Sequence, residues 1–264
     1  MSYLELDGNN IFYEVKGEGP RITILRGLSR SSAFWLGFDE ILSKDFEVLT
    51  IDHRGLGKTS VEMKWTDSIN DIAGDIVKVW DSIGWDSCHV FGLSLGGMVA
   101  MELAASFPNR LSSLVVANSS TRETGLYRVS PRALLRLALG SVNGFHRCLL
   151  RLVTTDSFFE KNQQVYFPLW KAILTEEGFP RETSLKQILA AARFKIDKRI
   201  DSSKVPTLVL VGANDQFVPP EHSKLIHKLI EGSSFQIVEE AGHEISMGRE
   251  IEIESILKTW VKDC

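Results

Sequence analysis

The sequence has few cysteines, and their arrangement suits neither a metal site nor a redox pair. Three occur among 264 residues, at Cys88, Cys148 and Cys264. They form no Cys-x-x-Cys pair and have no zinc-type spacing to a histidine. Since three is an odd number, at least one thiol is unpaired. We therefore expect isolated thiols in a reducing compartment, with no metal ion or cofactor held by cysteine.

Long basic runs and long apolar runs are also missing. The formal net charge is -4, and no block of Lys and Arg could form a basic face, so we expect no nucleic-acid partner. No stretch of 18 apolar residues predicts a membrane-spanning helix. The first residues include acidic side chains and no apolar segment typical of a signal peptide. We therefore expect a cytoplasmic protein without a membrane partner, and the sequence leaves the oligomeric state open.

Short apolar runs alternate with helical patterns along most of the chain. The segment 46–51 is almost entirely apolar, as in a strand that is covered on both faces. Residues 69–83 instead place apolar side chains at helical spacing. Alternation of this kind predicts an α/β fold with a mostly parallel sheet and helices on both faces. Eight strands are predicted, at residues 3–6, 11–15, 22–25, 46–51, 88–93, 111–118, 207–212 and 235–238, the first two joined as a hairpin.

The pattern changes between residues 121 and 204, where no convincing strand occurs. Apolar residues from 131 to 193 have helical spacing, and glycines and prolines, Pro168 among them, are expected to divide this segment into short helices. The sequence therefore predicts a core formed by residues 1–120 and 205–264. It predicts a helical cap, residues 121–204, inserted in that core.

A Gly-x-Ser-x-Gly pattern lies between a predicted strand and a predicted helix. Residues 88–93 run directly into it and residues 95–107 run directly out of it. This context predicts a sharp turn that lifts the Ser94 hydroxyl above the sheet, with Gly92 and Gly96 allowing close approach of the flanking segments. The start of the following helix would favour a developing negative charge. Ser94 is therefore the candidate nucleophile.

A serine hydroxyl needs a base, and the base needs an acid that orients it. His243 follows the predicted strand 235–238, and Asp215 follows the strand 207–212. Loops at the carboxyl ends of parallel strands are where α/β sheets place their sites. The chain order Ser94, Asp215, His243 is that of one serine hydrolase fold and differs from the others. These three residues are the predicted catalytic triad.

These motifs resemble the α/β-hydrolase superfamily over nearly the whole chain. Residues 92–97 look like its nucleophile elbow, 52–60 like its Asp-x-Arg-Gly-x-Gly-x-Ser segment, 212–219 like its acid loop and 241–243 like its histidine loop. The resemblance implies a mostly parallel sheet of about eight strands. It also implies a serine hydrolase that cleaves a carboxylic ester, lactone or related acyl bond of a small molecule without a cofactor.

The resemblance further implies an oxyanion hole formed by the backbone N–H groups of Leu28 and Leu95. One departure affects this loop, because Arg26 precedes Gly27 where the family usually has histidine. Arg26 either replaces the bracing role of that histidine or places positive charge near an acidic group of the substrate. Five apolar side chains are candidates for lining the substrate pocket between core and cap: Trp35, Phe145, Trp170, Phe217 and Val218.

The sequence also bears on activities other than ester hydrolysis. Residues 55–59 end like a phosphate-binding loop, but Asp52 stands where that loop needs glycine, and no helix follows in register. Family members that cleave haloalkanes or epoxides use an aspartate at the elbow, which Ser94 replaces. A C–C bond hydrolase, a perhydrolase of the haloperoxidase type, and a non-catalytic binding protein that retains the triad remain alternatives.

Overall fold

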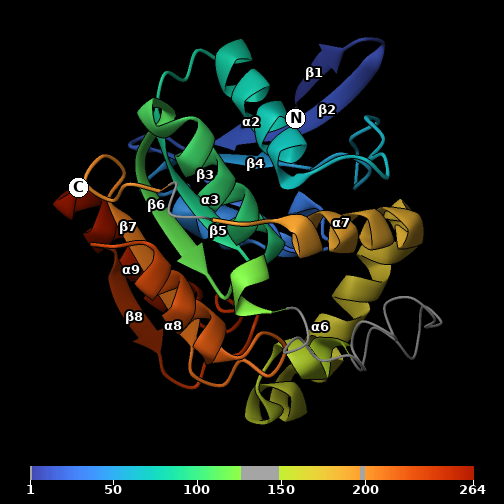
Figure 1. Cartoon of the computed structure of the whole chain (residues 1–264). Helices are drawn as coiled ribbons and strands as arrows, with labels where there is room; N and C mark the ends of the chain where they lie inside the picture. The colour runs from blue at the N-terminus through green and yellow to red at the C-terminus, as the bar shows by residue number, and fades with distance from the viewer. Residues whose placement is uncertain (1, 126–148, 197–199) are drawn as a thin grey trace.

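One eight-stranded sheet organises the chain in the computed structural model, which describes residues 2–125, 149–196 and 200–264 (Figure 1). The strand order is β1-β2-β4-β3-β5-β6-β7-β8. The pairs β1–β2 and β2–β4 are antiparallel, and the other pairs are parallel. The bounds are β1 Ser2–Leu6, β2 Asn9–Lys16, β3 Arg21–Leu25, β4 Glu47–Ile51, β5 Cys88–Leu93, β6 Leu111–Ala117, β7 Thr207–Gly212 and β8 Ser234–Val238.

The predicted strands are all present, which confirms the α/β fold. Burial explains why apolar and polar residues do not alternate in their sequences. Every residue of β7 is buried, and β3, β4 and β5 are each buried at all but one residue. A strand covered on both faces has no solvent side, so it is apolar at successive positions.

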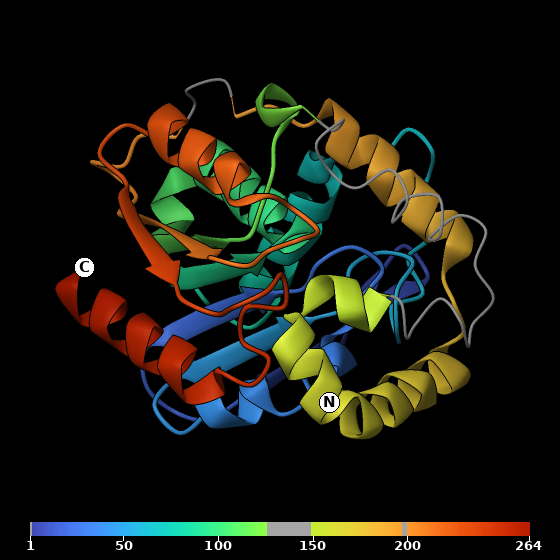
Figure 2. The same cartoon turned by 90° about the horizontal axis from the view of Figure 1, so that it is seen from below.

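Helices cover both faces of the sheet (Figure 2). On one face lie α2, α3 and α8, which share a core with the sheet, and on the other lie α1 and α9. Their bounds are α1 Phe38–Leu42, α2 Ile69–Ser82, α3 Leu95–Ser106, α8 Pro220–Leu229 and α9 Glu250–Asp263. At the start of α2, the carboxylate of Asp71 accepts hydrogen bonds from the N–H and the hydroxyl of Ser68, at 2.8 and 2.7 Å. The Asp71 carboxylate thus provides an acceptor for the N–H of the residue that precedes the helix, as in a capping box.

Between β6 and β7 the described residues include two long helices, α6 (Asp156–Glu177) and α7 (Arg181–Arg193). The prediction that Pro168 would end a helix is wrong, because Pro168 lies inside the 22-residue α6. Proline removes one helical hydrogen bond, to the carbonyl of Gln164. Gln164 and Pro168 are both exposed, so water can satisfy that carbonyl. The buried side chains of Phe159, Trp170 and Leu174 share one helix face across the proline, and their packing keeps the helix continuous.

Within the described residues, no helix is long and apolar enough to cross a membrane. In the same ranges, no three His, Cys, Asp or Glu side chains gather as a group that could hold a metal ion. Cys88 is a buried free thiol and Cys264 an exposed one, while Cys148 lies outside the described residues.

Candidate active site

Ser94 stands in a strained turn between β5 and α3. Its backbone has φ 59° and ψ -117°, a conformation that residues with a side chain rarely adopt. The neighbours hold the turn in place. The Ser94 N–H donates to the carbonyl of Ala117 at 2.9 Å, and the Ser94 carbonyl accepts from the hydroxyl of Ser119 at 2.7 Å. Such strain persists only where surrounding contacts determine it.

The glycines on either side of Ser94 are required by close backbone contacts, as predicted. A Cβ added to Gly92 would lie 2.3 Å from the carbonyl oxygen of Gly96. A Cβ on Gly96 would lie 2.2 Å from the carbonyl oxygen of Leu25. Any side chain at either position would push α3 away from the sheet. Leu95 begins α3, so its N–H has no acceptor within the helix and lies beside the nucleophile candidate.

Asp215 and His243 form a buried hydrogen-bonded pair. The Nδ1 atom of His243 lies 2.7 Å from Oδ2 of Asp215. The other carboxylate oxygen of Asp215 accepts from the N–H groups of Phe217 and Val218, each at 2.8 Å. The ring of Phe217 contacts the His243 imidazole edge-on, with 4.8 Å between centroids. These contacts fix the direction of both side chains.

Asn118 joins the acid loop to the histidine loop, a role that the sequence did not suggest. It follows β6 with φ 46° and is completely buried. Its amide nitrogen donates to the carbonyls of Gly242 and His243 at 2.9 and 2.8 Å. Its amide oxygen accepts from the N–H of Gly212 at 2.8 Å. The only sequence signal is a polar residue, tolerant of positive φ, directly after a buried strand.

Replacing Asn118 by alanine should weaken both folding and activity. The change leaves the buried N–H of Gly212 and two loop carbonyls without their partner, which should lower the free energy of unfolding by about 2–4 kcal/mol. The loosened histidine loop should lower kcat roughly 10- to 100-fold. Urea unfolding and steady-state ester hydrolysis measure the two effects. The control is Asn214→Ala, which removes an exposed amide from the acid loop itself. Equal losses in the two variants would contradict the bridging role.

Ser94 and His243 line one small cavity, of about 30 Å³. Gly27 and Leu28 form one wall, and a Cβ on Gly27 would lie 3.1 Å from the Ser94 Cβ. The structure therefore brings the predicted nucleophile, the predicted base and the loop of Leu28 to one place. The remaining residues of the lining are Arg30, Leu93, Leu149, Val153, Phe217 and Glu244.

The five pocket candidates have different positions. Phe217 lines the cavity of Ser94. Trp35, Trp170 and Val218 are not among the described residues that line this cavity. Trp35 packs against Phe38 and Phe91 in the core that α1 and α9 share with the sheet. Trp170 of α6 packs edge-on against Phe34. Large aromatic side chains fill cores as readily as pockets, and sequence spacing does not separate the two. Phe145 lies outside the described residues.

Arg26 forms a buried ion pair with Glu244, the residue after His243. Its two terminal nitrogens donate to the two carboxylate oxygens at 2.8 and 2.9 Å. The guanidinium also lies over the ring of Trp35, 4.6 Å from its centroid. Burial favours a raised pKa for Glu244, but the guanidinium groups of Arg26 and Arg30 hold that pKa below its ordinary value. Arg26 therefore braces the loop before Gly27 against the histidine loop, the first of the two roles considered for it.

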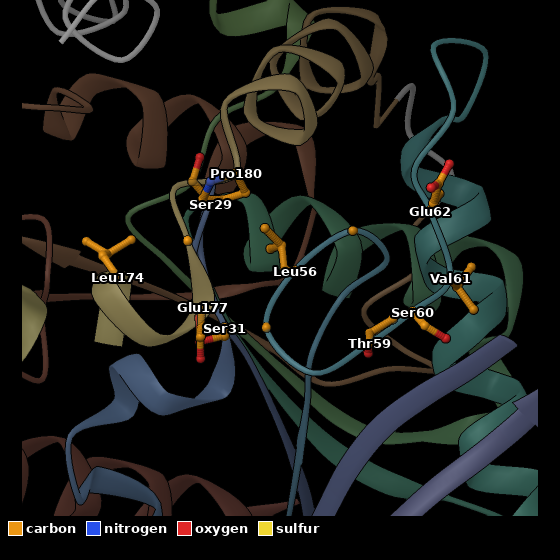
Figure 3. Close-up of a pocket in the computed structure, with 13 residues that line it drawn as sticks. Ser29, Ser31, Leu56, Thr59, Ser60, Val61, Glu62, Leu174, Glu177 and Pro180 are labelled. Atoms are coloured by element: carbon orange, nitrogen blue, oxygen red, sulfur yellow. The ribbon is translucent and has the colours of Figure 1, made fainter. Parts of the chain in front are cut away.

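A second cavity, of about 140 Å³, lies beside the 52–60 segment (Figure 3). Its lining includes Ser31 and Glu177, and the Ser31 hydroxyl donates to the Glu177 carboxylate at 2.8 Å. Asp52 occupies the interior of the segment, where its carboxylate accepts the N–H groups of Ser32 and Lys58 at 2.6 and 2.9 Å. A carboxylate in this position repels phosphate, which agrees with the rejection of a nucleotide-binding loop.

Fold and site together define an α/β hydrolase. The family model described as alpha/beta hydrolase fold matches residues 20–250. The chain belongs to this family.

Named relatives extend over most of the chain. A protein of Caulobacter segnis named "Putative carbamate hydrolase RutD" is 30% identical over 247 residues, with 89% of this chain and 90% of the relative covered. A solved hydrolase of Pseudomonas aeruginosa superposes with a TM-score of 0.84 at 23% identity, covering 98% of this chain and 97% of that one. The enol-lactonase of Burkholderia xenovorans LB400 gives a TM-score of 0.82 at 21% identity, covering 99% and 100%. The two solved structures share the fold.

Proposed function

We propose that this hydrolase cleaves a carboxylic ester or lactone of a small molecule through a Ser94–His243–Asp215 triad. One observation carries the proposal. Ser94 and His243 line the same cavity, while the Nδ1 atom of His243 is held by Asp215 at 2.7 Å. A carboxylate on Nδ1 selects the tautomer that leaves Nε2 free to accept a proton.

The reaction proceeds in two halves. As the Ser94 hydroxyl attacks the carbonyl carbon, Nε2 of His243 takes its proton, and the N–H groups of Leu28 and Leu95 stabilise the oxyanion. The intermediate collapses to an acyl-enzyme when His243 gives the proton to the leaving alcohol. Water, deprotonated by His243, then attacks the acyl carbon, and His243 returns the proton to the Ser94 oxygen as the acid is released. We assign residues 121–204 to a cap that shapes the pocket for the substrate.

A carbamate is the second candidate substrate. The observation that favours it is the name of the Caulobacter segnis relative, which matches nine tenths of this chain. A carbamate is attacked at its carbonyl carbon, so the same three side chains would serve in the same order. The two candidates differ on the acyl side of the carbonyl, where a carbamate carries nitrogen and an ester carries carbon, and a substrate panel separates them.

The test is hydrolysis of p-nitrophenyl esters with acyl chains of two to twelve carbons, together with a p-nitrophenyl carbamate. We expect turnover by the wild type that is greatest for short acyl chains, because the cavity at Ser94 is small. The Ser94→Ala variant should retain no more than about one thousandth of that activity. Absence of turnover by the folded wild type on every ester would contradict the proposal. Turnover of the carbamate alone would favour the second candidate.

A further inference from the structure

Arg30 places a buried cation in the wall of the Ser94 cavity. It follows β3 by five residues, and its side chain is only 5% exposed. Successive residues of this loop face different cavities. Leu28 and Arg30 line the cavity of Ser94, whereas Ser29 and Ser31 line the second cavity (Figure 3). The Arg30 side chain is thus on the side of the candidate nucleophile.

Two aromatic rings hold the guanidinium in position. Its central carbon lies 4.4 Å from the ring centroid of Phe34 and 4.4 Å from that of Trp170. Both rings are buried. The face of an aromatic ring attracts a guanidinium but takes none of the N–H bonds directed along the plane of the cation. The rings therefore fix Arg30 and leave its in-plane donors for another acceptor.

The described residues supply no such acceptor. The Nη1 atom of Arg30 is buried and has no hydrogen-bond partner among them, and no described carboxylate forms an ion pair with this side chain. The nearby carboxylates are already engaged. Both oxygens of Glu244 accept from Arg26, and those of Asp215 accept from His243 and two backbone N–H groups. Burial lowers the pKa of Arg30 to about 10, which leaves it charged at neutral pH.

A buried charged donor without a partner is unfavourable, and a ligand that supplies an acceptor relieves this. The planar fork of a guanidinium fits a carboxylate with two parallel hydrogen bonds. We propose that Arg30 binds a free carboxylate of the substrate, so that the substrate class is a short ester carrying a second, ionised carboxyl group. This inference deepens the proposed function and rests on it. Because Arg30 and Ser94 line the same cavity, we expect only a few bonds between that carboxylate and the reacting carbonyl.

Two esters of similar shape test the proposal. Monoethyl succinate carries a carboxylate where ethyl butyrate has a methyl group, and release of acid from each is followed in a pH-stat. We expect the wild type to prefer monoethyl succinate in kcat/KM. The ratio of the two kcat/KM values should fall at least about 30-fold in Arg30→Gln. Arg30→Lys keeps the charge without the fork and should lower the ratio less.

The control is Arg21→Gln, at the opposite end of β3, where the side chain is 42% exposed. This variant should leave the ratio unchanged. A wild-type preference for ethyl butyrate, or a ratio that Arg30→Gln does not alter, would overturn the inference. The lysine variant keeps the test valid if the glutamine variant does not fold.

A binding measurement separates this inference from the proposed function. Calorimetric titration of Ser94→Ala with monoethyl succinate needs no turnover, and binding should be lost in the Ser94→Ala/Arg30→Gln double variant. Hydrolysis of both esters that depends on Ser94 but not on Arg30 would overturn only the inference. Binding that depends on Arg30, without hydrolysis of any ester by the wild type, would support carboxylate binding and overturn the esterase function. No binding by Ser94→Ala would overturn the carboxylate site.

Discussion

The double variant Ser94→Ala/His243→Ala should be no less active than either single variant. Each single change should lower kcat for a p-nitrophenyl ester at least about 1,000-fold. Without the imidazole, the hydroxyl is not activated, and without the hydroxyl, the imidazole has no proton to accept. The two side chains line one cavity, which is the arrangement such a unit requires. The comparison uses steady-state rates of the wild type, the two single variants and the double variant, each corrected for spontaneous hydrolysis.

His227→Ala is the matched control for the histidine change. His227 lies in α8, and its Nδ1 atom contacts the hydroxyl of Ser233 at 2.8 Å rather than any residue that lines the Ser94 cavity. The activity of His227→Ala should stay within about threefold of that of the wild type, as for a substitution away from the site. If the losses of the two single variants multiply in the double variant, the side chains act independently and the proposed triad fails.

Glu244→Gln should lower the free energy of unfolding by about 3–5 kcal/mol. The change leaves the guanidinium of Arg26 buried without its carboxylate and removes the negative charge near that of Arg30. Arg26→Met should lower the free energy of unfolding by less, about 2–3 kcal/mol, because Glu244 then still has the positive charge of Arg30 nearby. The double variant Arg26→Met/Glu244→Met should be more stable than the sum of the single losses implies, because it leaves no broken pair. Urea unfolding at pH 7 gives all three values.

The pH dependence of the stability lost in Glu244→Gln shows whether that loss comes from the ionised carboxylate. Because the pKa of Glu244 in the folded chain is held below its ordinary value of 4.5, the stabilisation is present above that pH. It is lost as the pH falls through the folded pKa. The difference between the wild type and Glu244→Gln should therefore shrink in acid.

An exposed ion pair supplies the comparison for this prediction. Arg249 pairs with Glu240, whose side chain is 87% exposed, and Arg249→Met should cost no more than about 1 kcal/mol. Two results would contradict a stabilising role for the buried pair. One is a loss of unfolding free energy in Glu244→Gln as small as that in Arg249→Met, and the other is a loss in Glu244→Gln that is the same at pH 3 as at pH 7.

Local sequence was sufficient to predict the elbow at Ser94. The glycines at 92 and 96, the apolar strand before them and the helix after them lie within about twenty residues. Their close contacts depend mainly on the backbone of that segment and β3. The strands were predictable for a similar reason, since burial on both faces leaves an apolar run whatever the partner strand is.

Contacts between distant residues were not predictable in this way. Arg26 and Glu244 are separated by 218 positions, and nothing near either residue indicates the other. The position of Asn118 depends on the meeting of two later loops, and the positions of Trp35 and Trp170 depend on how the core is filled. Pro168 was misjudged because packing on both sides of the proline outweighs one lost hydrogen bond.

Covalent labelling tests the central claim most directly. Diethyl p-nitrophenyl phosphate transfers its phosphoryl group to an activated serine, and the adduct is stable enough to locate by peptide mass spectrometry. We predict release of one equivalent of p-nitrophenol, one adduct on Ser94, loss of esterase activity in proportion to labelling, and no adduct in Ser94→Ala. An adduct on another residue, or full esterase activity in protein labelled at Ser94, would contradict the account.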